Sequence, residues 1–178
     1  MKKLESTWYN MALVLTGIAV VAGAALGYVN SITAPTIEAI KAQQEKEAEQ
    51  QVLNGQEGTA IKITDPKGFG GALTVMVGLA QDGTILGYKV LESSETPGLG
   101  AKADFWFQKG EKGNIIGKTA GKLTVSKDGG DVDAITASTI TSRAFLKCIN
   151  AAYEELSKSN ADGQSGASQQ AGELNNNI

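Results

Sequence analysis

Histidine is absent from this chain of 178 residues, and its only cysteine is Cys148. A single cysteine cannot form an intramolecular disulfide. Zinc sites built from cysteine and histidine, all-cysteine iron–sulfur clusters and histidine-ligated haem all need more of these ligands, so we expect no metal centre of these kinds. Nucleophile pairs of the Ser–His or Cys–His type are excluded too, and we assign no catalytic residue. Any redox chemistry must therefore be carried by an organic cofactor.

The chain also lacks a large excess of charge of either sign. It has 16 basic and 19 acidic side chains, a formal net charge of -3. Such a chain has no basic footprint for a phosphate backbone, so we expect no nucleic-acid partner.

Charge is missing altogether between Glu5 and Glu38, and this gap contains the apolar run Trp8–Val29. At about 1.5 Å per residue, a helix over this run spans about 33 Å, close to the hydrocarbon core of a bilayer at about 30 Å. A cleaved signal peptide is the alternative, because Ala22–Ala24 resembles a cleavage site, but the apolar run is longer than signal peptides use. We predict a transmembrane anchor over residues 1–30.

The flanking charges predict how this anchor is oriented. Lys2 and Lys3 precede the apolar run. By the positive-inside rule, the N-terminus lies in the cytoplasm and the rest of the chain on the extracytoplasmic, periplasmic side. The sequence thus predicts a single-pass protein of the cell (inner) membrane.

Residues 31–58 are predicted to form a helical stalk. Pro35 fits the first turn of a helix, with Thr33 nearby as a possible cap. The residues from Thr36 to Leu53 are mostly alanine, glutamate, glutamine and lysine, which favour helix. Apolar residues are sparse here, so we expect a solvated helix ending near Gly55; a partner-binding helix is the alternative.

Residues 59–158 are predicted to form the folded domain. The run Ala72–Ala80 is strongly apolar, and Asp82-Gly83 is a typical hairpin turn before a second strand, Thr84–Ser93. We expect these two strands to pair antiparallel. The sequence predicts a second hairpin, between Leu123–Val125 and Val132–Ile135.

A helix from Thr141 to Leu156 follows, with Cys148 near the apolar stripe that would pack on the sheet. The stripe consists of Phe145, Ile149, Ala152 and Leu156. An antiparallel sheet with packed helices places the domain in the α+β class. The tail, residues 159–178, is polar and low in complexity, and we expect it to be disordered.

Two segments of the domain need a functional or a structural explanation. The loop SSETPGLGAKADFWFQ, Ser93–Gln108, contains glycines that let a planar or phosphate-bearing ligand approach the main chain, although an ordinary loop has the same composition. Its aromatic residues Phe105–Phe107 predict a short docked helix. The segment DAITASTITS, Asp133–Ser142, gathers hydroxyls beside a helix start, either as caps and strand residues or as a site of covalent chemistry.

Three pieces of this sequence resemble a known family. They are GFGGALTVMVGLAQDGTILGYKVLESSETPGLGAK, DAITASTITSRA and the single N-terminal membrane span. Together they are similar to the covalent-FMN subunits of membrane redox complexes, which include the G subunit of the Rnf electron-transport complex and the longer C subunit of the sodium-translocating NADH:quinone reductase. The resemblance implies an FMN-binding domain at residues 59–158.

The family's attachment motif can be laid on DAITASTIT. Asp133 matches its aspartate, Thr136 its first hydroxyl, Thr139 the acceptor and Thr141 the trailing hydroxyl. The resemblance implies that a flavin transferase joins the phosphate of FMN to the Thr139 hydroxyl as a phosphoester.

The motif departs from the family's pattern at two positions. Ala137 stands where glycine is usual, and Ser138 stands where alanine is usual. Both residues are small, so we expect the same backbone path. Ser138 remains an alternative acceptor.

The resemblance also implies roles for the ETPGLGAK loop. Leu99 would lie against the flavin ring, with Glu95, Thr96 and Lys102 as polar contacts. The chain would be an electron carrier rather than an enzyme by itself.

The implied partners are the membrane and iron–sulfur subunits of the Rnf complex. That complex couples ferredoxin oxidation and NAD reduction to translocation of Na⁺ or H⁺. The alternatives are a C-type subunit of the NADH:quinone reductase, a membrane-tethered binding or assembly module without redox activity, and a domain that binds a solute noncovalently.

Overall fold

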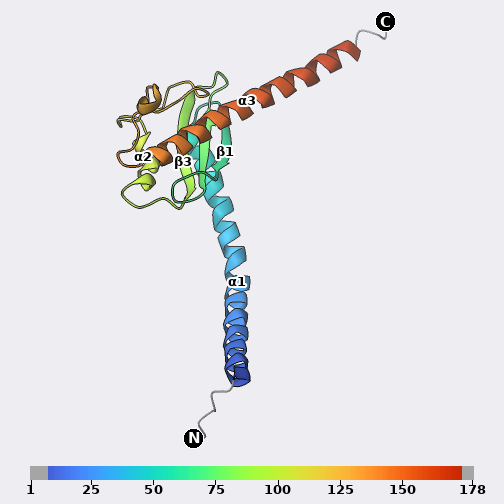
Figure 1. The fold of residues 1–178 in the computed structure, drawn as a ribbon. Coiled ribbons are helices and arrows are strands. Elements are labelled where there is room, and N and C mark those ends of the chain that lie inside the picture. The colour runs from blue at the N-terminus through green and yellow to red at the C-terminus, as the bar shows by residue number, and fades with distance from the viewer. Residues whose placement is uncertain (1–7, 174–178) are drawn as a thin grey trace. The chain divides into compact units, whose positions relative to one another are not determined.

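The computed structural model describes the backbone of residues 8–173 and the side chains of residues 8–161. A long helix, three strands, several short helical turns and a second long helix follow one another along the chain (Figure 1). The chain divides into two compact units, Met1–Gln43 and Gln44–Ile178, and the boundary falls inside helix α1, Trp8–Leu53. The predicted α+β class is confirmed.

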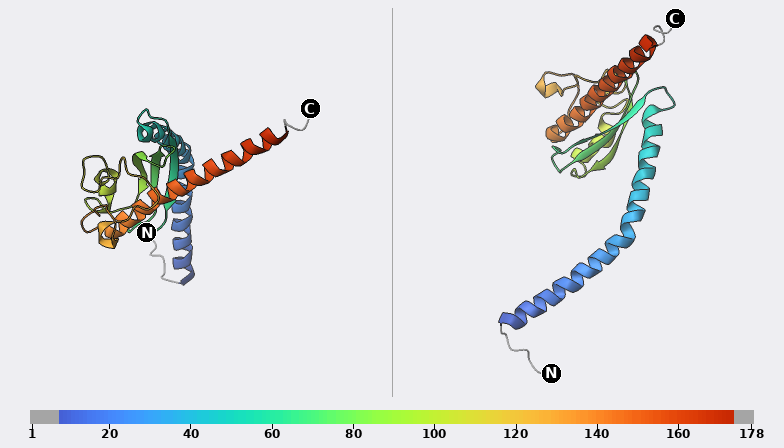
Figure 2. Two further views of the ribbon diagram at one scale, coloured as in Figure 1. Left: turned by 90° about the horizontal axis from the view of Figure 1, so that it is seen from above. Right: turned by 90° about the vertical axis from the view of Figure 1, so that its right-hand side faces the viewer.

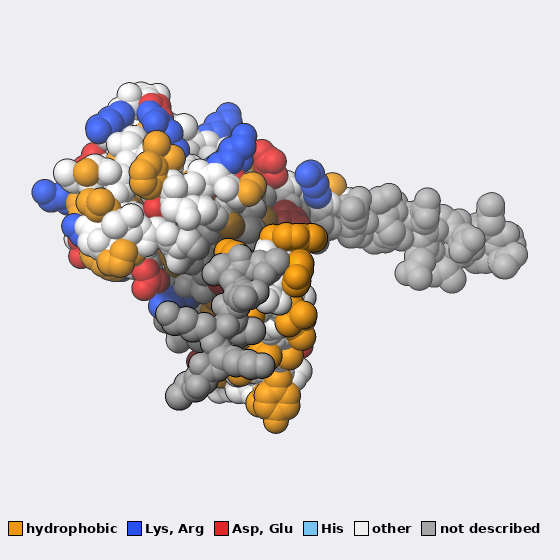
Figure 3. All heavy atoms as spheres, turned by 60° about the horizontal axis from the view of Figure 1, so that its bottom comes forward, with side chains coloured by type: hydrophobic (Ala, Val, Ile, Leu, Met, Phe, Trp, Pro, Cys, Tyr) orange, Lys and Arg blue, Asp and Glu red, His pale blue; other side chains and the backbone are white. Residues whose placement is uncertain are grey.

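In the first unit, α1 exposes its apolar side chains instead of burying them in a core. Leu13, Val21 and Leu26 are 73%, 70% and 72% exposed, and Figure 3 shows apolar side chains gathered along this helix. The helix is long and apolar enough to cross a membrane. Lipid would cover such a surface, and a helix satisfies its own main-chain hydrogen bonds there.

The predicted position of Pro35 at the start of a separate stalk helix is wrong, because Pro35 lies inside α1. A proline within a helix removes one main-chain hydrogen bond. Two hydroxyls in the preceding turn make additional bonds to carbonyl oxygens: Ser31 Oγ donates to Tyr28 at 2.8 Å, and Thr33 Oγ1 donates to Val29 at 2.8 Å. The helix nevertheless continues through the proline instead of starting there.

The second unit is built on an antiparallel sheet in the order β1 (Thr59–Asp65), β2 (Leu73–Leu79), β3 (Ile85–Ser93). The predicted pairing of β2 with β3 is confirmed. At the connecting turn, Asp82 Oδ1 accepts a hydrogen bond from the N–H of Thr84 at 2.9 Å. This bond lowers the pKa of the Asp82 carboxyl below its usual value.

Strand β1 is not predicted from the sequence. Its side chains alternate: Ile61 and Ile63 pack on the main core, whereas Lys62 is exposed and pairs with Glu45 at 2.6 Å. Alternation with a period of two is the signal of a half-buried strand. In β1 the alternation covers only 7 residues, so the longer apolar runs elsewhere in the sequence dominate the hydrophobic pattern.

All seven residues of β2 are buried, because both faces of the sheet are covered. Helix α3 lies across one face (Figure 2), where Val75 and Val77 join the main core. On the other face, Met76 packs with Ala48 and Val52 from the end of α1. The prediction that this helix is solvated along its whole stalk is therefore wrong for its last turns.

Two glycines let the end of α1 approach the sheet closely. Gly78 on β2 and Gly87 on β3 are partners in register. A Cβ atom on Gly78 would meet the carbonyl oxygen of Val52, and a Cβ on Gly87 would lie 2.7 Å from the same oxygen. Glycine inside a strand often marks such an approach of another main chain.

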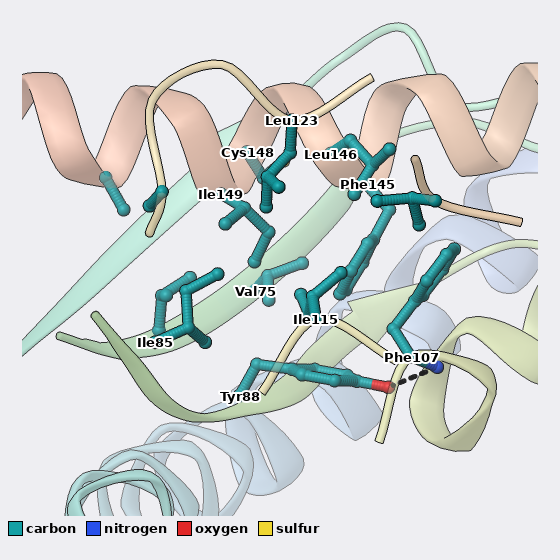
Figure 4. Packing of buried hydrophobic residues seen from close by; sticks show 14 of the residues in the cluster. Val75, Ile85, Tyr88, Phe107, Ile115, Leu123, Phe145, Leu146, Cys148 and Ile149 are labelled. Carbon is teal, nitrogen blue, oxygen red and sulfur yellow. Dashed lines mark hydrogen bonds between the residues drawn. The ribbon is translucent and has the colours of Figure 1, made fainter. Parts of the chain in front are cut away.

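An aromatic cluster fixes the face of the sheet that α3 covers to α3 and to the residue after α2 (Ala103–Trp106; Figure 4). Phe145 on α3 stacks on Phe107 with ring centroids 4.4 Å apart, and meets Tyr88 edge-on at 4.8 Å. The Tyr88 hydroxyl donates to the carbonyl of Ala103 at 2.8 Å and accepts from the N–H of Phe107 at 3.1 Å. Burial raises the pKa of the Tyr88 phenol, so the hydroxyl keeps its proton and both bonds.

The second predicted hairpin, between Leu123–Val125 and Val132–Ile135, is wrong. In the described structure these segments meet at one isolated bridge, Val125 with Val132, and the bridge is parallel. The residues between them form a 3-10 turn, η2 (Ser126–Asp128). The turn uses main-chain groups that a hairpin ladder would need, so the segment folds as a compact loop.

The remaining helices follow the sequence more closely. The predicted short helix is α2, Ala103–Trp106, and α3 extends over Thr139–Glu173, starting earlier than the predicted Thr141. The predicted stripe of α3 is buried, namely Phe145, Ile149, Ala152 and Leu156.

Helix α3 also continues past Lys158, so the described part of the predicted disordered tail is helical. The tail has no proline to stop a helix. Residues 174–178 lie outside the described residues. The functional division of the chain at residues 30, 58 and 158 stays a prediction.

The glycine contact predicts a packing-specific loss of stability. Gly78→Ala should lower the free energy of unfolding by about 2 kcal/mol, because its Cβ would overpack against Val52. The matched control is Gly110→Ala: this glycine has a φ of 94° and open space around it, so only a backbone cost of about 1 kcal/mol is expected. Urea unfolding of the full chain in detergent measures both. Equal losses would contradict the overpacking argument.

Candidate functional site

A pocket of about 370 Å³ lies where the loop after β3 meets the first turn of α3. It brings together segments that are far apart in the sequence. Its lining consists of Phe69, Glu95, Thr96, Leu99, Gly100, Ala137, Ser138, Thr139, Ile140 and Thr141. Six of the eight predicted site residues are in this lining. Thr136 and Lys102 are not, and their contacts stay predictions.

The turn before α3 is closed by one buried hydroxyl. Ser142 Oγ accepts a hydrogen bond from the N–H of Ile135 at 3.0 Å and donates to the carbonyl of Ser138 at 2.9 Å. The N–H of Ser138 in turn donates to the Ile135 carbonyl at 3.0 Å. These bonds hold the residues between Ile135 and Ser142 in a tight bend over the pocket. This role of Ser142 is not predicted from the sequence.

The bend requires a left-handed backbone at Ala137, whose φ is 62°. The covalent-FMN family that this chain resembles usually has glycine at this position. An L-residue with a side chain is strained in this region by roughly 1–2 kcal/mol, and glycine is not. Ala137 therefore holds a conformation that suits glycine better.

Four hydroxyls in this segment differ in accessibility. Thr136 is exposed and lies outside the pocket lining. Ser138 is 8% exposed and Thr141 is 1% exposed, so both face inward. Thr139 is half-buried, lines the pocket and is the first residue of α3. Of the four, it alone combines a place in the pocket with partial access from outside.

Two of the buried polar atoms at this pocket have no hydrogen-bond partner. They are Oε1 of Glu95, a residue that is 7% exposed, and Oγ1 of Thr141. A third such atom in the described structure, Asp65 Oδ2, lies 3.1 Å from Lys147 Nζ and so has a charged partner. Burying polar atoms without partners costs free energy, which a ligand with hydrogen-bonding groups would recover.

Gly100 leaves room for this polar floor. A Cβ atom at Gly100 would meet Oε2 of Glu95, the other oxygen of the same carboxylate, and would lie 2.8 Å from Oγ1 of Thr141. A side chain here would therefore fill the space above the two polar groups. The glycine of the loop after β3 keeps the pocket open to a ligand.

The rim of the pocket is apolar. Phe69, Leu99 and Ile140 are 69%, 41% and 50% exposed, and each lines the pocket. An apolar rim over a polar floor suits a ligand with a flat apolar part and a hydrogen-bonding part. The described residues contain no group of His, Cys, Asp and Glu that could hold a metal ion.

One cation reaches the hydroxyl of Thr139. Lys127 Nζ donates to Thr139 Oγ1 at 3.3 Å. The neighbouring Asp128 is held by Arg143, whose Nε and Nη2 each lie 2.7 Å from a carboxylate oxygen. Hydrogen bonds from Arg143 lower the pKa of the Asp128 carboxyl. The sequence does not point to Lys127, because an exposed lysine in a predicted hairpin has no distinguishing pattern.

The backbone at Ala137 predicts opposite effects of two substitutions. Ala137→Gly should raise the free energy of unfolding by up to about 1 kcal/mol, because relief of strain exceeds the added chain entropy. Ala137→Val should lower it by about 2 kcal/mol, because a β-branched side chain fits a positive φ poorly. Thermal unfolding of the full chain measures both. Equal stability of the glycine and valine variants would show that the bend is not left-handed.

Known families match both parts of the chain. A family model of the FMN-binding domain matches residues 68–154, the range that contains the whole pocket. A second family model, of the RnfG N-terminal region, matches residues 1–54, close to the full extent of α1.

Three curated relatives are named as G subunits. That of the Na⁺-translocating ferredoxin:NAD⁺ oxidoreductase complex of Acetobacterium woodii is 30% identical over 206 residues, covering 88% of this chain and 98% of the relative. That of the ion-translocating oxidoreductase complex of Vibrio atlanticus is 39% identical over 113 residues, 61% of this chain and 54% of the relative. The Escherichia coli relative, of a complex with the same name, is 38% identical over 96 residues, 52% of this chain and 47% of the relative.

The chain thus spans about half the length of the Vibrio and Escherichia relatives and nearly all of the Acetobacterium one. The N-terminal family model, the FMN-binding domain model and the full-length relative agree. This chain belongs to the family of G subunits of ion-translocating oxidoreductase complexes.

Proposed function

We propose that this chain is the electron-carrying G subunit of a membrane-bound, ion-translocating ferredoxin:NAD oxidoreductase complex of the Rnf type. It holds FMN covalently through a phosphoester to Thr139. The single observation that carries the proposal is the pocket beside Thr139, whose floor contains two buried polar atoms without partners. FMN combines a flat ring, a polyol chain and a phosphate, and so matches the rim, the floor and the hydroxyl in turn.

Each part of the pocket has a task in this proposal. Thr139 supplies the linking oxygen at the first residue of α3. Free N–H groups at the start of a helix favour a negatively charged group such as a phosphodiester. A bound FMN supplies electron transfer in one-electron and two-electron steps.

The floor and the rim would hold the rest of the cofactor. The Glu95 carboxylate would accept hydrogen bonds from the polyol hydroxyls, and the Thr141 hydroxyl would donate or accept one. Phe69, Leu99 and Ile140 would cover the apolar part of the ring and exclude water. These contacts, and those proposed for Thr96, Lys102, Thr136 and Ser138, rest on the resemblance and on the pocket's chemistry.

The chain would bind and position FMN without completing a reaction alone. Electrons would reach and leave the pocket through other subunits of the complex, namely its membrane and iron–sulfur subunits. A flavin transferase would load the cofactor during maturation. The name of the Acetobacterium relative supports a ferredoxin:NAD complex over the C-type subunit of an NADH:quinone reductase.

The same proposal includes an orientation in the membrane. Helix α1 would anchor the chain in the inner membrane, with its N-terminus in the cytoplasm. The FMN-binding domain would lie on the periplasmic side. Lys2 and Lys3 before the apolar run support this orientation.

Covalent attachment predicts a result on a denaturing gel. Coexpressed with the flavin transferase, the full chain should give a fluorescent band, since only covalent flavin survives denaturation. Thr139→Ala should abolish the fluorescence. Ser138→Ala and Thr136→Ala should keep it, because Ser138 is 8% exposed and Thr136 lies outside the pocket lining, while Thr139 is half-buried and lines the pocket. Loss of the band in Ser138→Ala alone would identify Ser138 as the acceptor and contradict the proposal.

The orientation predicts which thiols a membrane-impermeant maleimide can reach. Ser159, an exposed residue of α3, is replaced by cysteine in a Cys148→Ala background. It should be labelled in cells once the outer envelope is opened. The control is Cys148→Ala alone, which should stay unlabelled. Labelling only after the inner membrane is broken would place the domain in the cytoplasm.

The native thiol of Cys148 interferes little with this labelling test. Cys148 is buried, and burial raises the pKa of its thiol to about 11. Maleimides react with the thiolate, and the raised pKa leaves little thiolate at neutral pH. Wild-type chain therefore serves as a second control for accessibility.

A further inference from the structure

Lys127 is placed beside the hydroxyl of Thr139 by the fold rather than by its own neighbours in sequence. Its Nζ lies 3.3 Å from Thr139 Oγ1 and donates to it. The two residues belong to different elements, Lys127 to the turn η2 and Thr139 to the first turn of α3. The group that binds the Thr139 hydroxyl in the described structure is therefore an ammonium.

The ion pair between Arg143 and Asp128, which we call the clamp, holds η2 against α3 at this point. Arg143 lies one turn along α3 from Thr139. Its guanidinium donates one hydrogen bond to each carboxylate oxygen of Asp128, both at 2.7 Å. Such a fork of two parallel bonds fixes orientation as well as distance. At the start of the turn, the side chain of Val125 is fully buried in the core. The main chain of Lys127 is therefore fixed on both sides.

The carboxylates nearest to Lys127 in the sequence are engaged by other cations. Both oxygens of Asp128 are engaged by Arg143. Asp131, the next carboxylate along the chain, pairs with Lys118 at 2.8 Å. With its nearest carboxylates occupied, the ammonium of Lys127 is available to an oxygen at Thr139.

We propose that Lys127 activates the acceptor hydroxyl for flavin transfer and then binds the resulting phosphodiester. This inference rests on the proposed attachment of FMN at Thr139. By donating to Oγ1, the ammonium stabilises the negative charge that develops on this oxygen as its proton leaves. A donor aimed at developing charge is the arrangement that lowers a reaction barrier.

The step balances with a flavin dinucleotide as the donor, since its phosphoanhydride supplies a leaving group. Thr139 Oγ1 forms a bond to the phosphorus of the FMN half, and the bond from that phosphorus to the bridging oxygen breaks. The nucleoside monophosphate leaves with the electron pair of the broken bond. The proton of Thr139 passes to a base of the transferase or to water. No group is oxidised or reduced in this step.

The product gives Lys127 a second task. A phosphodiester has one negative charge, located on oxygens next to the former hydroxyl. An ammonium already within reach of Oγ1 is in place to bind it with a charge-assisted hydrogen bond. The same side chain thus serves both the reacting hydroxyl and the finished linkage.

The experiment follows flavin loading of the full chain in detergent, purified from cells that lack the transferase. Purified transferase and flavin adenine dinucleotide are added, and covalent fluorescence gives the initial rate at several chain concentrations. The variants are Lys127→Ala, Lys127→Arg and Asp128→Asn. The matched control is Lys122→Ala, which removes the same charge from an exposed position in the same segment. Thermal unfolding confirms that each variant is folded.

We expect Lys127→Ala to lower kcat for loading about tenfold or more while KM for the chain stays within about twofold. Lys127→Arg should recover most of the rate, because it keeps the charge and the donor. Asp128→Asn should slow loading a few-fold, because it loosens the clamp but keeps Lys127. The control should load at the wild-type rate.

Two results would overturn the inference. One is wild-type loading by Lys127→Ala. The other is a raised KM with unchanged kcat, which would make Lys127 a contact for the transferase instead of an activator of the hydroxyl. The wild-type chain reports separately on the proposed function: if it gains no covalent flavin, attachment at Thr139 fails whatever the lysine variants do.

Discussion

The contact of Phe145 with Phe107 and Tyr88 is the interaction on which the rest of the domain depends. It fixes the first turns of α3 against β3 and α2 at the same time. Because Tyr88 also binds the main chain of Ala103 and Phe107, the loop after β3 is tied to the same point. The two halves of the pocket, which are far apart in sequence, therefore meet beside a single buried cluster.

Much of the fold could be predicted where the pattern is local. The apolar run of β2, the turn at Asp82 and the stripe of α3 each reflect a periodicity within one element. The packed end of α1 could not be predicted this way, because its few buried residues matter only opposite Gly78 and Gly87. The false hairpin at Val125 has a related cause: the residues suit strands, but the 3-10 turn between them satisfies the main chain first.

The candidate site was predictable to the extent that it consists of a motif. The resemblance of DAITASTIT to the family's attachment motif implied Thr139 and its neighbours, and the resemblance of the ETPGLGAK loop implied Glu95 and Leu99, whereas the residue types alone left a purely structural explanation open. The sequence could not reveal which polar atoms would be buried without a partner, since burial of Glu95 and Thr141 arises only when loop and helix meet. It also could not reveal Ser142 as the closure of the bend or Lys127 as a neighbour of Thr139.

The complete burial of β2 bears on how another enzyme can reach a hydroxyl inside this domain. Hydrogen exchange is slowest where both faces of a strand are covered, so the amides of β2 would be the last to open. The bend before α3 lies outside the sheet and is tied by only a few bonds. Local opening of that bend leaves every bond of the β-ladder intact. In the proposed attachment, a modifying enzyme would reach Thr139 beside Lys127 at this bend, while the sheet stays closed as a rigid template for the pocket.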